Sequence, residues 1–219
     1  MILTLAFLLA MPVFAGPMHQ AEALYKAKKY GQAGTIWVVE AKKGSAKAQL
    51  NLGLLALHGH GVKQDYKVAR RWFQLAASKG NAYAMTNLGF LSYSGHGVKK
   101  SSKNAFRWFL KAAKRGDPHG MSNLGTLYRD GQGTKRNFKN AIKWYRRAGD
   151  AGQVNALNNL GFMYYQGKGV RKDKSKAYYW FYRAAQRGHK KARANIKELR
   201  AEMTSEQLEV AEALIAQNE

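Results

Sequence analysis

Small and apolar residues recur along the chain at spacings of four, one and three, which place them on a single face of a helix. Two such sets are Ala84, Leu88, Gly89, Ser92 and, later in the chain, Ala156, Leu160, Gly161, Tyr164. A second kind of segment carries Ala69, Trp72 and Ala76 at helical spacing, with an aromatic residue directly after the tryptophan. The two patterns predict two kinds of helix that alternate along the chain and pack as antiparallel pairs.

The whole pattern repeats every 36 residues without a change of register. Asn-Leu-Gly begins at Asn51, Asn87, Asn123 and Asn159. Gly-x-Gly begins at Gly59, Gly95, Gly131 and Gly167, and the tryptophan recurs as Trp72, Trp108, Trp144 and Trp180. A strict period of this length is typical of stacked supersecondary units. The fold class predicted is all-α, a right-handed α-solenoid of antiparallel helix pairs.

Helix ends are marked with the same period. A side chain able to accept a backbone hydrogen bond opens each second helix, at Asp65, Ser101, Asn137 and Asp173. A glycine closes that helix, at Gly80, Gly116, Gly152 and Gly188. Ser45, Asn81 and Asp117 are the expected caps of first helices. Because glycine is a poor helix former, the glycine inside each first helix predicts a close crossing of the partner helix. The tryptophans are expected to fill the layer between repeats.

Together these motifs resemble the Sel-1-like repeat, a relative of the tetratricopeptide repeat. The resemblance rests on Leu-Gly, a tyrosine-like position, Gly-x-Gly-Val, Lys-Ala or its equivalent, Trp, Ala-Ala and Gly, in that order. It gives four full repeats, at 45–80, 81–116, 117–152 and 153–188. Ala56 and Ser92 stand at the usual tyrosine, Thr134 at the valine, and Gly149 at the second alanine.

The segments outside these repeats are interpreted as half units and caps. Residues 16–44 are a half repeat marked by Tyr30, Ala33, Trp37, Ala41 and Gly44. Residues 189–219 are capping helices, the last one opened by a capping box of Thr204 with Gln207 and running through Ala216. Its Leu208, Ala211, Leu214 and Ile215 are expected to cover the final repeat.

Residues 1–15 are predicted to be a secretory signal peptide. Ile2 to Leu9 are nearly all apolar, no charged side chain precedes Glu22, and Val13-Phe14-Ala15 places small residues where a signal peptidase requires them. The positively charged leader is missing, and the alternative is a buried N-terminal helix, which Pro12 and Pro17 would interrupt. The apolar run is too short for a permanent transmembrane anchor. The mature chain is therefore expected to begin at Gly16 and to be periplasmic or secreted.

The charge is high and uneven. The net charge is +24, and because the last 22 residues carry −5, residues 1–197 carry +29. Such a field attracts acidic proteins, acidic glycans, anionic lipid headgroups or nucleic acid. Ala82 to Ser94 and Val154 to Gln166 contain no lysine or arginine, whereas the second helices hold many. First and second helices are therefore expected to face different surroundings.

Two binding surfaces are predicted. In tetratricopeptide-like stacks the first helices line the concave side, and the resemblance implies the same here. The residues placed on this first-helix face are Tyr83, Thr86, Phe90, Tyr93, His119, Ser122, Thr126, Arg129, Asn155, Asn158, Phe162 and Tyr165. The second surface, a basic ridge, follows each Gly-x-Gly turn and consists of Lys63, Lys99, Lys100, Lys135, Arg136, Arg171 and Lys172. The alternatives are that several face residues only pack between repeats, and that the ridge lysines are solvated loop charges.

No constellation for catalysis, cofactor or metal binding is present in the sequence. The chain has no cysteine, so thiol chemistry and disulfides are excluded. The acids within the repeats are single, and Asp65, Asp117 and Asp173 are explained as caps. His58-x-His60 with His96 lies in glycine loops without an acidic ligand beside it, and each Gly-x-Gly lies in a hairpin turn instead of between a strand and a helix.

The sequence thus favours a non-enzymatic protein-binding scaffold of the cell envelope, as the family resemblance implies. The main alternative is a cationic module that binds anionic polymer, such as polysaccharide, peptidoglycan or lipid headgroups. A minor alternative comes from cysteine-rich relatives associated with penicillin binding and weak β-lactam hydrolysis, but their disulfide framework is missing here. Nucleic acid is not an expected partner of an exported chain.

Overall fold

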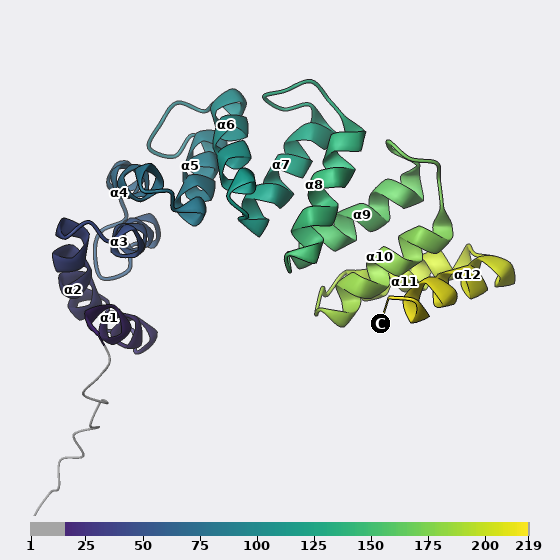
Figure 1. The fold of residues 1–219 in the computed structure, drawn as a ribbon, viewed down its shortest axis with the longest axis horizontal. Coiled ribbons are helices and arrows are strands. Elements are labelled where there is room, and N and C mark those ends of the chain that lie inside the picture. Colours follow the sequence, from purple (N-terminus) through teal and green to yellow (C-terminus); the bar gives the residue numbers. More distant parts are fainter. Residues whose placement is uncertain (1–15, 219) are drawn as a thin grey trace, which may run out of the picture. The chain divides into compact units, whose positions relative to one another are not determined.

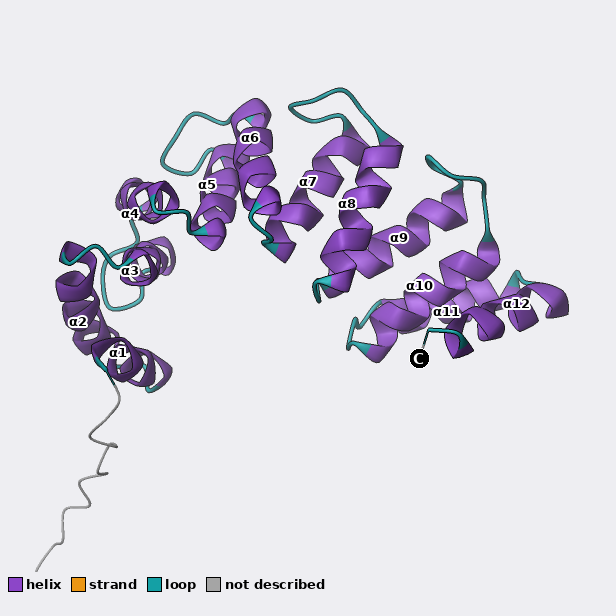
Figure 2. Cartoon of the chain, in the orientation of Figure 1, coloured by secondary structure: helices purple, strands orange, loops and turns teal. Residues whose placement is uncertain are grey.

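The computed structural model describes residues 16–218, and every regular element in that range is an α-helix (Figures 1 and 2). The predicted all-α class with stacked helix pairs is confirmed. The signal peptide predicted for residues 1–15 lies outside the described residues. None of the helices described is long and apolar enough to span a bilayer.

The chain divides into two compact units. Unit 1, residues 16–81, contains α1 (Pro17–Lys26), α2 (Tyr30–Lys42), α3 (Ala46–His58) and α4 (Tyr66–Ser78). Unit 2, residues 82–218, begins with α5 (Ala82–Ser94), α6 (Ser102–Lys114), α7 (Pro118–Asp130) and α8 (Phe138–Asp150). It continues with α9 (Val154–Gln166), α10 (Lys174–Gln186), α11 (Ala192–Ala201) and α12 (Ser205–Ala216).

Each repeat is a pair of 13-residue helices joined by a glycine-containing loop. The pairs α3–α4, α5–α6, α7–α8 and α9–α10 are the most extensively packed neighbours. In unit 2 the three long loops that join the members of a pair lie along one edge (Figure 2). Equivalent residues of successive loops are therefore brought to the same side of the unit.

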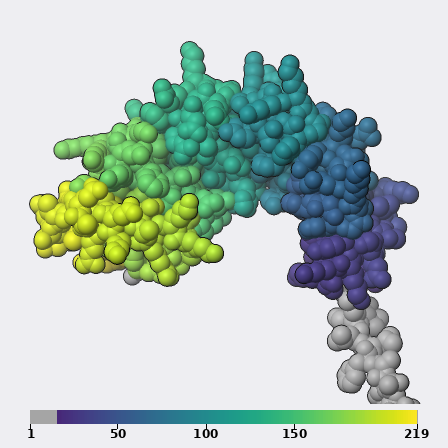
Figure 3. Space-filling view, turned by 180° about the vertical axis from the view of Figure 1, so that it is seen from behind, coloured from purple at the N-terminus to yellow at the C-terminus, as the bar shows by residue number. Residues whose placement is uncertain are grey.

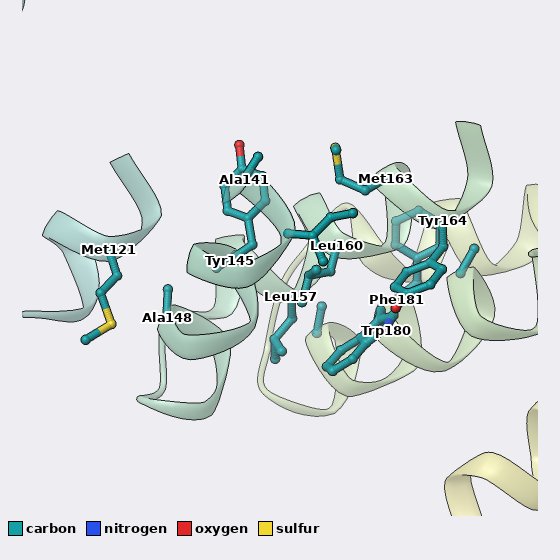
Figure 4. Packing of buried hydrophobic residues seen from close by; sticks show 14 of the residues in the cluster. Met121, Ala141, Tyr145, Ala148, Leu157, Leu160, Met163, Tyr164, Trp180 and Phe181 are labelled. Atoms are coloured by element: carbon teal, nitrogen blue, oxygen red, sulfur yellow. The ribbon is translucent and has the colours of Figure 1, made fainter. Parts of the chain in front are cut away.

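An aromatic ring on each second helix packs against the glycine of its partner first helix. A methyl group on Gly161 would lie 2.4 Å from a ring carbon of Phe181, and one on Gly89 would lie 2.5 Å from Phe109. The expectation that the partner helix leaves no room for a side chain is confirmed. Figure 4 shows Phe181 among the buried residues of the last repeats, next to Tyr164 and Met163 of α9.

The aromatic residue after each tryptophan, and not the tryptophan itself, fills the interior of most repeats. Phe73 and Tyr145 are fully buried and Phe109 is 4% exposed. Trp72, Trp108 and Trp144 are only half-buried, whereas Trp180 is buried. The expectation that all four tryptophans fill one buried layer is therefore wrong for three of them. The glycine of the first helix fixes the point where the two helices cross. The second-helix residue that lies opposite this glycine is the aromatic residue directly after the tryptophan, and not the tryptophan.

The predicted caps of the second helices are confirmed. Asp65, Ser101, Asn137 and Asp173 each accept a hydrogen bond from a backbone amide in the first turn of the helix that follows. Backbone φ angles of 84° to 91° at Gly80, Gly116, Gly152 and Gly188 show that these glycines occupy the left-handed region. Among the first helices, Ser45 accepts from the amide of Ala48, and Asp117 accepts from that of Gly120.

The two ends of the chain differ in how well they were predicted. The segment interpreted as a half repeat contains two helices, because α1 precedes α2 and buries Ala21 against Trp37 and its neighbours. At the other end, the capping box of Thr204 and Gln207 is present and α12 ends at Ala216, as expected. Ala211 is fully buried, and Leu208, Leu214 and Ile215 pack against the core of unit 2.

Candidate functional site

The first helices of unit 2 lie next to one another and are joined by polar contacts between side chains. Thr86 Oγ1 on α5 donates a 2.6 Å hydrogen bond to Asp117, the N-cap of α7. Two imidazole contacts continue the row: the ring of His119 lies 6.0 Å from that of Tyr83, and its Nδ1 lies 2.8 Å from Gln153 Nε2. On α9, Asn158 Oδ1 accepts from Asn195 of α11 at 2.8 Å. Residues of the predicted first-helix face therefore form one layer.

The twelve residues of the first-helix face divide by exposure according to their position in the repeat. Thr86, Ser122 and Asn158, which are 36 residues apart, are each 8–9% exposed. They face the neighbouring repeat because adjacent first helices lie so close together. The placement of these three on an open surface is therefore wrong, and the alternative of packing between repeats applies to them.

The remaining residues of the face reach the surface to different degrees. Tyr83, Phe90 and Phe162 are 42%, 49% and 37% exposed. His119 and Asn155 are also exposed. Half-buried residues complete the set: Tyr93, Thr126, Arg129 and Tyr165. That this layer forms a concave surface remains a prediction of the family resemblance.

One recurring residue of the face was not anticipated from the sequence. The asparagine of the Asn-Leu-Gly motif lies one helical turn after the first face residue of its helix, four residues after His119 in the case of Asn123. Asn123 is therefore on the same side of α7 as His119 and Thr126, and its side chain is exposed. Asn87 Nδ2 donates a 2.9 Å hydrogen bond to the carbonyl of Tyr83. The recurrence of this asparagine every 36 residues is visible in the sequence. It identifies the repeat, but it does not show that the asparagine belongs to the first-helix face.

The face carries little charge. Neither α5 nor α9 contains lysine or arginine. The guanidinium of Arg129 on α7 donates to Asp130 at 2.6 and 2.9 Å, and this hydrogen bonding raises the pKa of Arg129. Arg129 is therefore paired with a carboxylate on its own helix. The exposed surface is aromatic and amide-rich, a composition suited to protein contact.

The C-terminal cap limits the face at its last repeat. Tyr165 Oη donates to the carboxylate of Glu202 at 3.0 Å. Because that proton is held by the carboxylate, the pKa of the Tyr165 hydroxyl is raised. The side chains of Phe162 and Tyr165 also line a small cavity of about 60 Å³ with Asn195 and Glu198 of α11.

The basic ridge is exposed throughout. Lys99, Lys100, Lys135, Arg136, Arg171 and Lys172 are all exposed on the three loops along one edge of unit 2 (Figure 2). Figure 3 shows side chains projecting from the part of the surface that these loops occupy. Lys63 is exposed on the equivalent loop of unit 1. In the described part of the chain, no ridge residue makes an ion pair.

The loops of the ridge are held by close packing on the preceding repeat. A methyl group on Gly133 would lie 2.2 Å from the carbonyl oxygen of Ser102, at the start of α6. The same is true of Gly169, whose added methyl would lie 2.5 Å from Phe138 Cβ. Both glycines have φ above 70°. In these two loops the second glycine of the motif therefore fixes the loop against the preceding repeat of unit 2.

A cavity of about 750 Å³ adjoins the last ridge loop, between Tyr164, residues 170–176 and Gln207 of α12. Its basic lining is partly neutralised, because Lys174 pairs with Glu202 and Lys176 pairs with Asp173 at 3.1 Å. Only Arg171 and Lys172 of its cationic residues are free of ion pairs. The cavity is thus an extension of the ridge.

The histidines of the loops are occupied by packing contacts. His60 stacks on Tyr30 at 4.6 Å between ring centroids, and its Nδ1 lies 2.9 Å from Tyr25 Oη. His96 Nδ1 lies 3.1 Å from Ser94 Oγ. Within residues 16–218, no group of three histidine or carboxylate side chains has the geometry of a metal site.

Comparisons with known proteins identify the repeat. The family model of the Sel1 repeat matches residues 46–81, 82–117, 118–153 and 154–189. No curated protein sequence matches the chain. A Sel1 repeat protein from Oxalobacter formigenes is 34% identical, with a TM-score of 0.75, and the match covers 83% of this chain and 74% of that one.

Two further structures extend the comparison. The protein c5321, described as a protective antigen of uropathogenic Escherichia coli, is 31% identical with a TM-score of 0.77; the match covers 84% of this chain but only 41% of that one. The immunity protein Pa5087 from Pseudomonas aeruginosa is 22% identical with a TM-score of 0.56, over 84% of this chain and 70% of that one, and shares the fold alone.

Proposed function

Because the chain belongs to the Sel1 repeat family, we propose that it is a non-enzymatic scaffold that binds a protein partner of the bacterial cell envelope. The binding surface is the exposed part of the first-helix face of unit 2. The observation that carries this proposal is the exposure of Tyr83 and Phe90 on α5 and of Phe162 on α9, between 37% and 49%. Neither of these first helices, which have α7 between them in the chain, contains a charged side chain.

Exposed aromatic side chains on a rigid helical framework are suited to protein recognition. Aromatic residues supply a large contact area at a low cost in conformational entropy and are enriched among the residues that dominate binding energy. The polar contacts of Thr86 and Asn158 with neighbouring repeats hold the helices that present them. The face is therefore ordered before a partner arrives, which lowers the entropic cost of association.

Export is part of the proposal, since it places the chain with an envelope partner. The apolar segment before Ala15 supports it. Mass analysis of the protein purified from its native host should show Gly16 as the first residue. A chain that retains Met1 would contradict the envelope location and would leave the binding surface unaffected.

The first-helix face is tested by capturing partners from an envelope extract with the mature chain at low and high salt. Changing Phe90 and Phe162 together to serine should reduce recovery of the specific partner about tenfold or more. An aromatic side chain that a partner buries at the centre of an interface typically contributes over 1 kcal/mol to binding. Val210→Ser is the matched control, because Val210 is also 49% exposed but lies on α12. Equal recovery with both variants would rule out the face.

A second candidate function is binding of an anionic polymer, such as an acidic polysaccharide or lipid headgroups, along the basic ridge. It is favoured by six exposed cations, none of them in an ion pair, on loops that share one edge of unit 2. Packed helices lie about 8–10 Å apart, which is close to the Debye length at physiological salt. The potentials of successive loops therefore overlap into one positive stripe.

We expect the change of Lys99, Lys100, Lys135 and Arg136 to glutamine to weaken binding to an acidic polysaccharide and to flatten its salt dependence. The unfolding free energy should stay within about 0.5 kcal/mol, since exposed loop charges contribute little to stability. The control changes Arg107, Lys114, Arg115 and Lys143, which are exposed at α6 and α8 away from the loops. The same loss in both variants would mean that net charge, and not the ridge, determines affinity.

A further inference from the structure

Unit 1 contains an apolar groove that is separate from the first-helix face and includes only Lys63 of the basic ridge. It has a volume of about 550 Å³ and lies between α2, α3, the loop that follows α3, and the start of α4. Its lining is mainly apolar, with the aliphatic side chains of Val38, Leu52, Leu55, Val62 and Val68 and the ring of Trp72. Lys63, Gln64 and Asp65 supply the polar part of its lining.

The groove exists because two positions of the repeat carry unusually small residues in unit 1. In unit 2 the corresponding positions are Phe106 and Tyr128, whose rings meet edge to face with centroids 5.2 Å apart. At the same two places, 72 residues earlier in the chain, stand Gly34 and Ala56. Two aromatic side chains are therefore missing from unit 1, and the space that they occupy between α6 and α7 is open between α2 and α3.

The rim of the groove exposes the side chains that such rings would cover. Val62, Val38 and Val68 are 51%, 37% and 39% exposed. Val98 and Val170 occupy the position of Val62 in later repeats, and both are half-buried, whereas Val62 is exposed. An apolar concavity of this size with exposed aliphatic walls is the usual form of a site for an apolar side chain or small ligand.

The charge around the groove indicates the character of what binds there. Residues 16–81 hold eleven lysine and arginine residues against three acids. Two of those acids are already paired, Glu22 with Lys47 and Glu40 with Lys43. The third, Asp65, caps α4. A partner segment of opposite charge gains from this field, and one of like charge is repelled.

We infer that the groove of unit 1 binds an acidic segment of a partner protein that inserts one phenylalanine or similarly large apolar side chain between α2 and α3. The chain's own repeats indicate the size of that side chain, because Phe106 fills the equivalent space in unit 2. The acidic flanks of the segment would lie against the lysines and arginines of unit 1. This site is separate from the first-helix face, so either one can fail without the other.

The test uses the mature full-length chain and two synthetic acidic peptides, each ten residues long and rich in aspartate and glutamate. One peptide has a central phenylalanine and the other has alanine at that position. Titration calorimetry at moderate salt should show the phenylalanine peptide binding about tenfold or more tightly, since full burial of a phenylalanine side chain is worth at least one decade of affinity. Added salt should weaken both peptides by a similar factor.

Two variants locate the site. Gly34→Phe places in the groove the residue that unit 2 carries there, and it should reduce affinity for the phenylalanine peptide to that of the alanine peptide. The Cβ of this variant would lie 3.3 Å from Leu55 Cδ1, a contact that a small side-chain shift relieves. Val62→Glu adds a negative charge at an exposed loop position and should have the same effect without touching the core. Gln32→Phe, on an exposed position of α2 outside the groove, is the matched control and should bind both peptides normally.

Three results would overturn the inference. Equal affinity of the two peptides would show that charge alone attracts them. Unchanged affinity for the phenylalanine peptide in Val62→Glu, with helicity preserved by circular dichroism, would place binding elsewhere. A dimer by light scattering that becomes a monomer in Gly34→Phe or Val62→Glu would identify a second copy of this chain as the occupant instead of an acidic partner.

Discussion

Replacing Phe109 with alanine is expected to lower the unfolding free energy by about 3–5 kcal/mol, the typical cost of truncating a buried phenylalanine. Phe109 is 4% exposed and packs directly on Gly89 of the partner helix. Replacing the adjacent Trp108, which is the more prominent residue in the sequence, should cost less than half as much. Trp108 is half-buried, and one of its contacts is with the ammonium of Lys111, 4.7 Å from the ring centroid.

The pair of variants is compared by urea unfolding followed by circular dichroism. The repeats that flank Phe109 should lose cooperativity with it, because a solenoid is stabilised largely by interfaces between neighbours. The decrease should therefore appear as a broader transition as well as an earlier one. Tyr145→Ala and Trp144→Ala repeat the comparison one unit later, where Tyr145 is fully buried and Trp144 is half-buried. A larger loss for the tryptophan at both places would mean that the interior has been assigned to the wrong position.

The sequence predicts the repeat and its helix ends, but it does not distinguish the buried Phe109 from the half-buried Trp108. The sequence predicts the 36-residue period, the helix caps and the glycine turns, because each of these depends on local backbone conformation and recurs in all four repeats. How deeply a side chain is buried depends on where two helices cross, and Trp108 and Phe109 are adjacent residues of the same helix. Both are aromatic, so composition and period treat them alike, and only the packing against Gly89 distinguishes them.

The binding surfaces show the same limit. The sequence identified the first-helix face by its lack of charge, and Tyr83 and Phe90 are indeed exposed there. It also placed Thr86 on that face, because Thr86 lies one helical turn from both. Its burial follows from the hydrogen bond to Asp117 of the next repeat, a contact between units that no single helix pattern contains.

The groove of unit 1 depends on departures from the repeat more than on the repeat itself. The sequence shows Ala56 at the position of the usual tyrosine of the repeat. The structure confirms that the helix pair still forms, and it also shows that Ala56 lines an open groove with Gly34. A repeat protein can therefore gain a site by losing side chains at one unit while its other units preserve the framework.

Gly161→Ala is expected to destabilise the chain by about 1–3 kcal/mol, the usual cost of overpacking a core. Replacing glycine by alanine within a helix ordinarily gains about 0.5–1 kcal/mol. At Gly161 the new methyl would lie 2.4 Å from two ring carbons of Phe181, so that ring or the helix must move.

Gly31→Ala on α2 is the control, because there the change in unfolding free energy is expected to be zero or stabilising. No atom lies within 4 Å of the position that its Cβ would take, and Gly31 has no positive φ. The same substitution should therefore leave the unfolding free energy unchanged or raise it slightly.

Both variants are measured by urea unfolding at one temperature. A double variant that combines Gly161→Ala with Phe181→Leu should recover part of the lost unfolding free energy, because leucine removes the ring atoms that clash with the new methyl group. If Gly161→Ala proves as stable as the unmodified chain, the glycine is not required by the helix crossing. The aromatic residue of each second helix would then have more freedom than its packing against the first helix indicates.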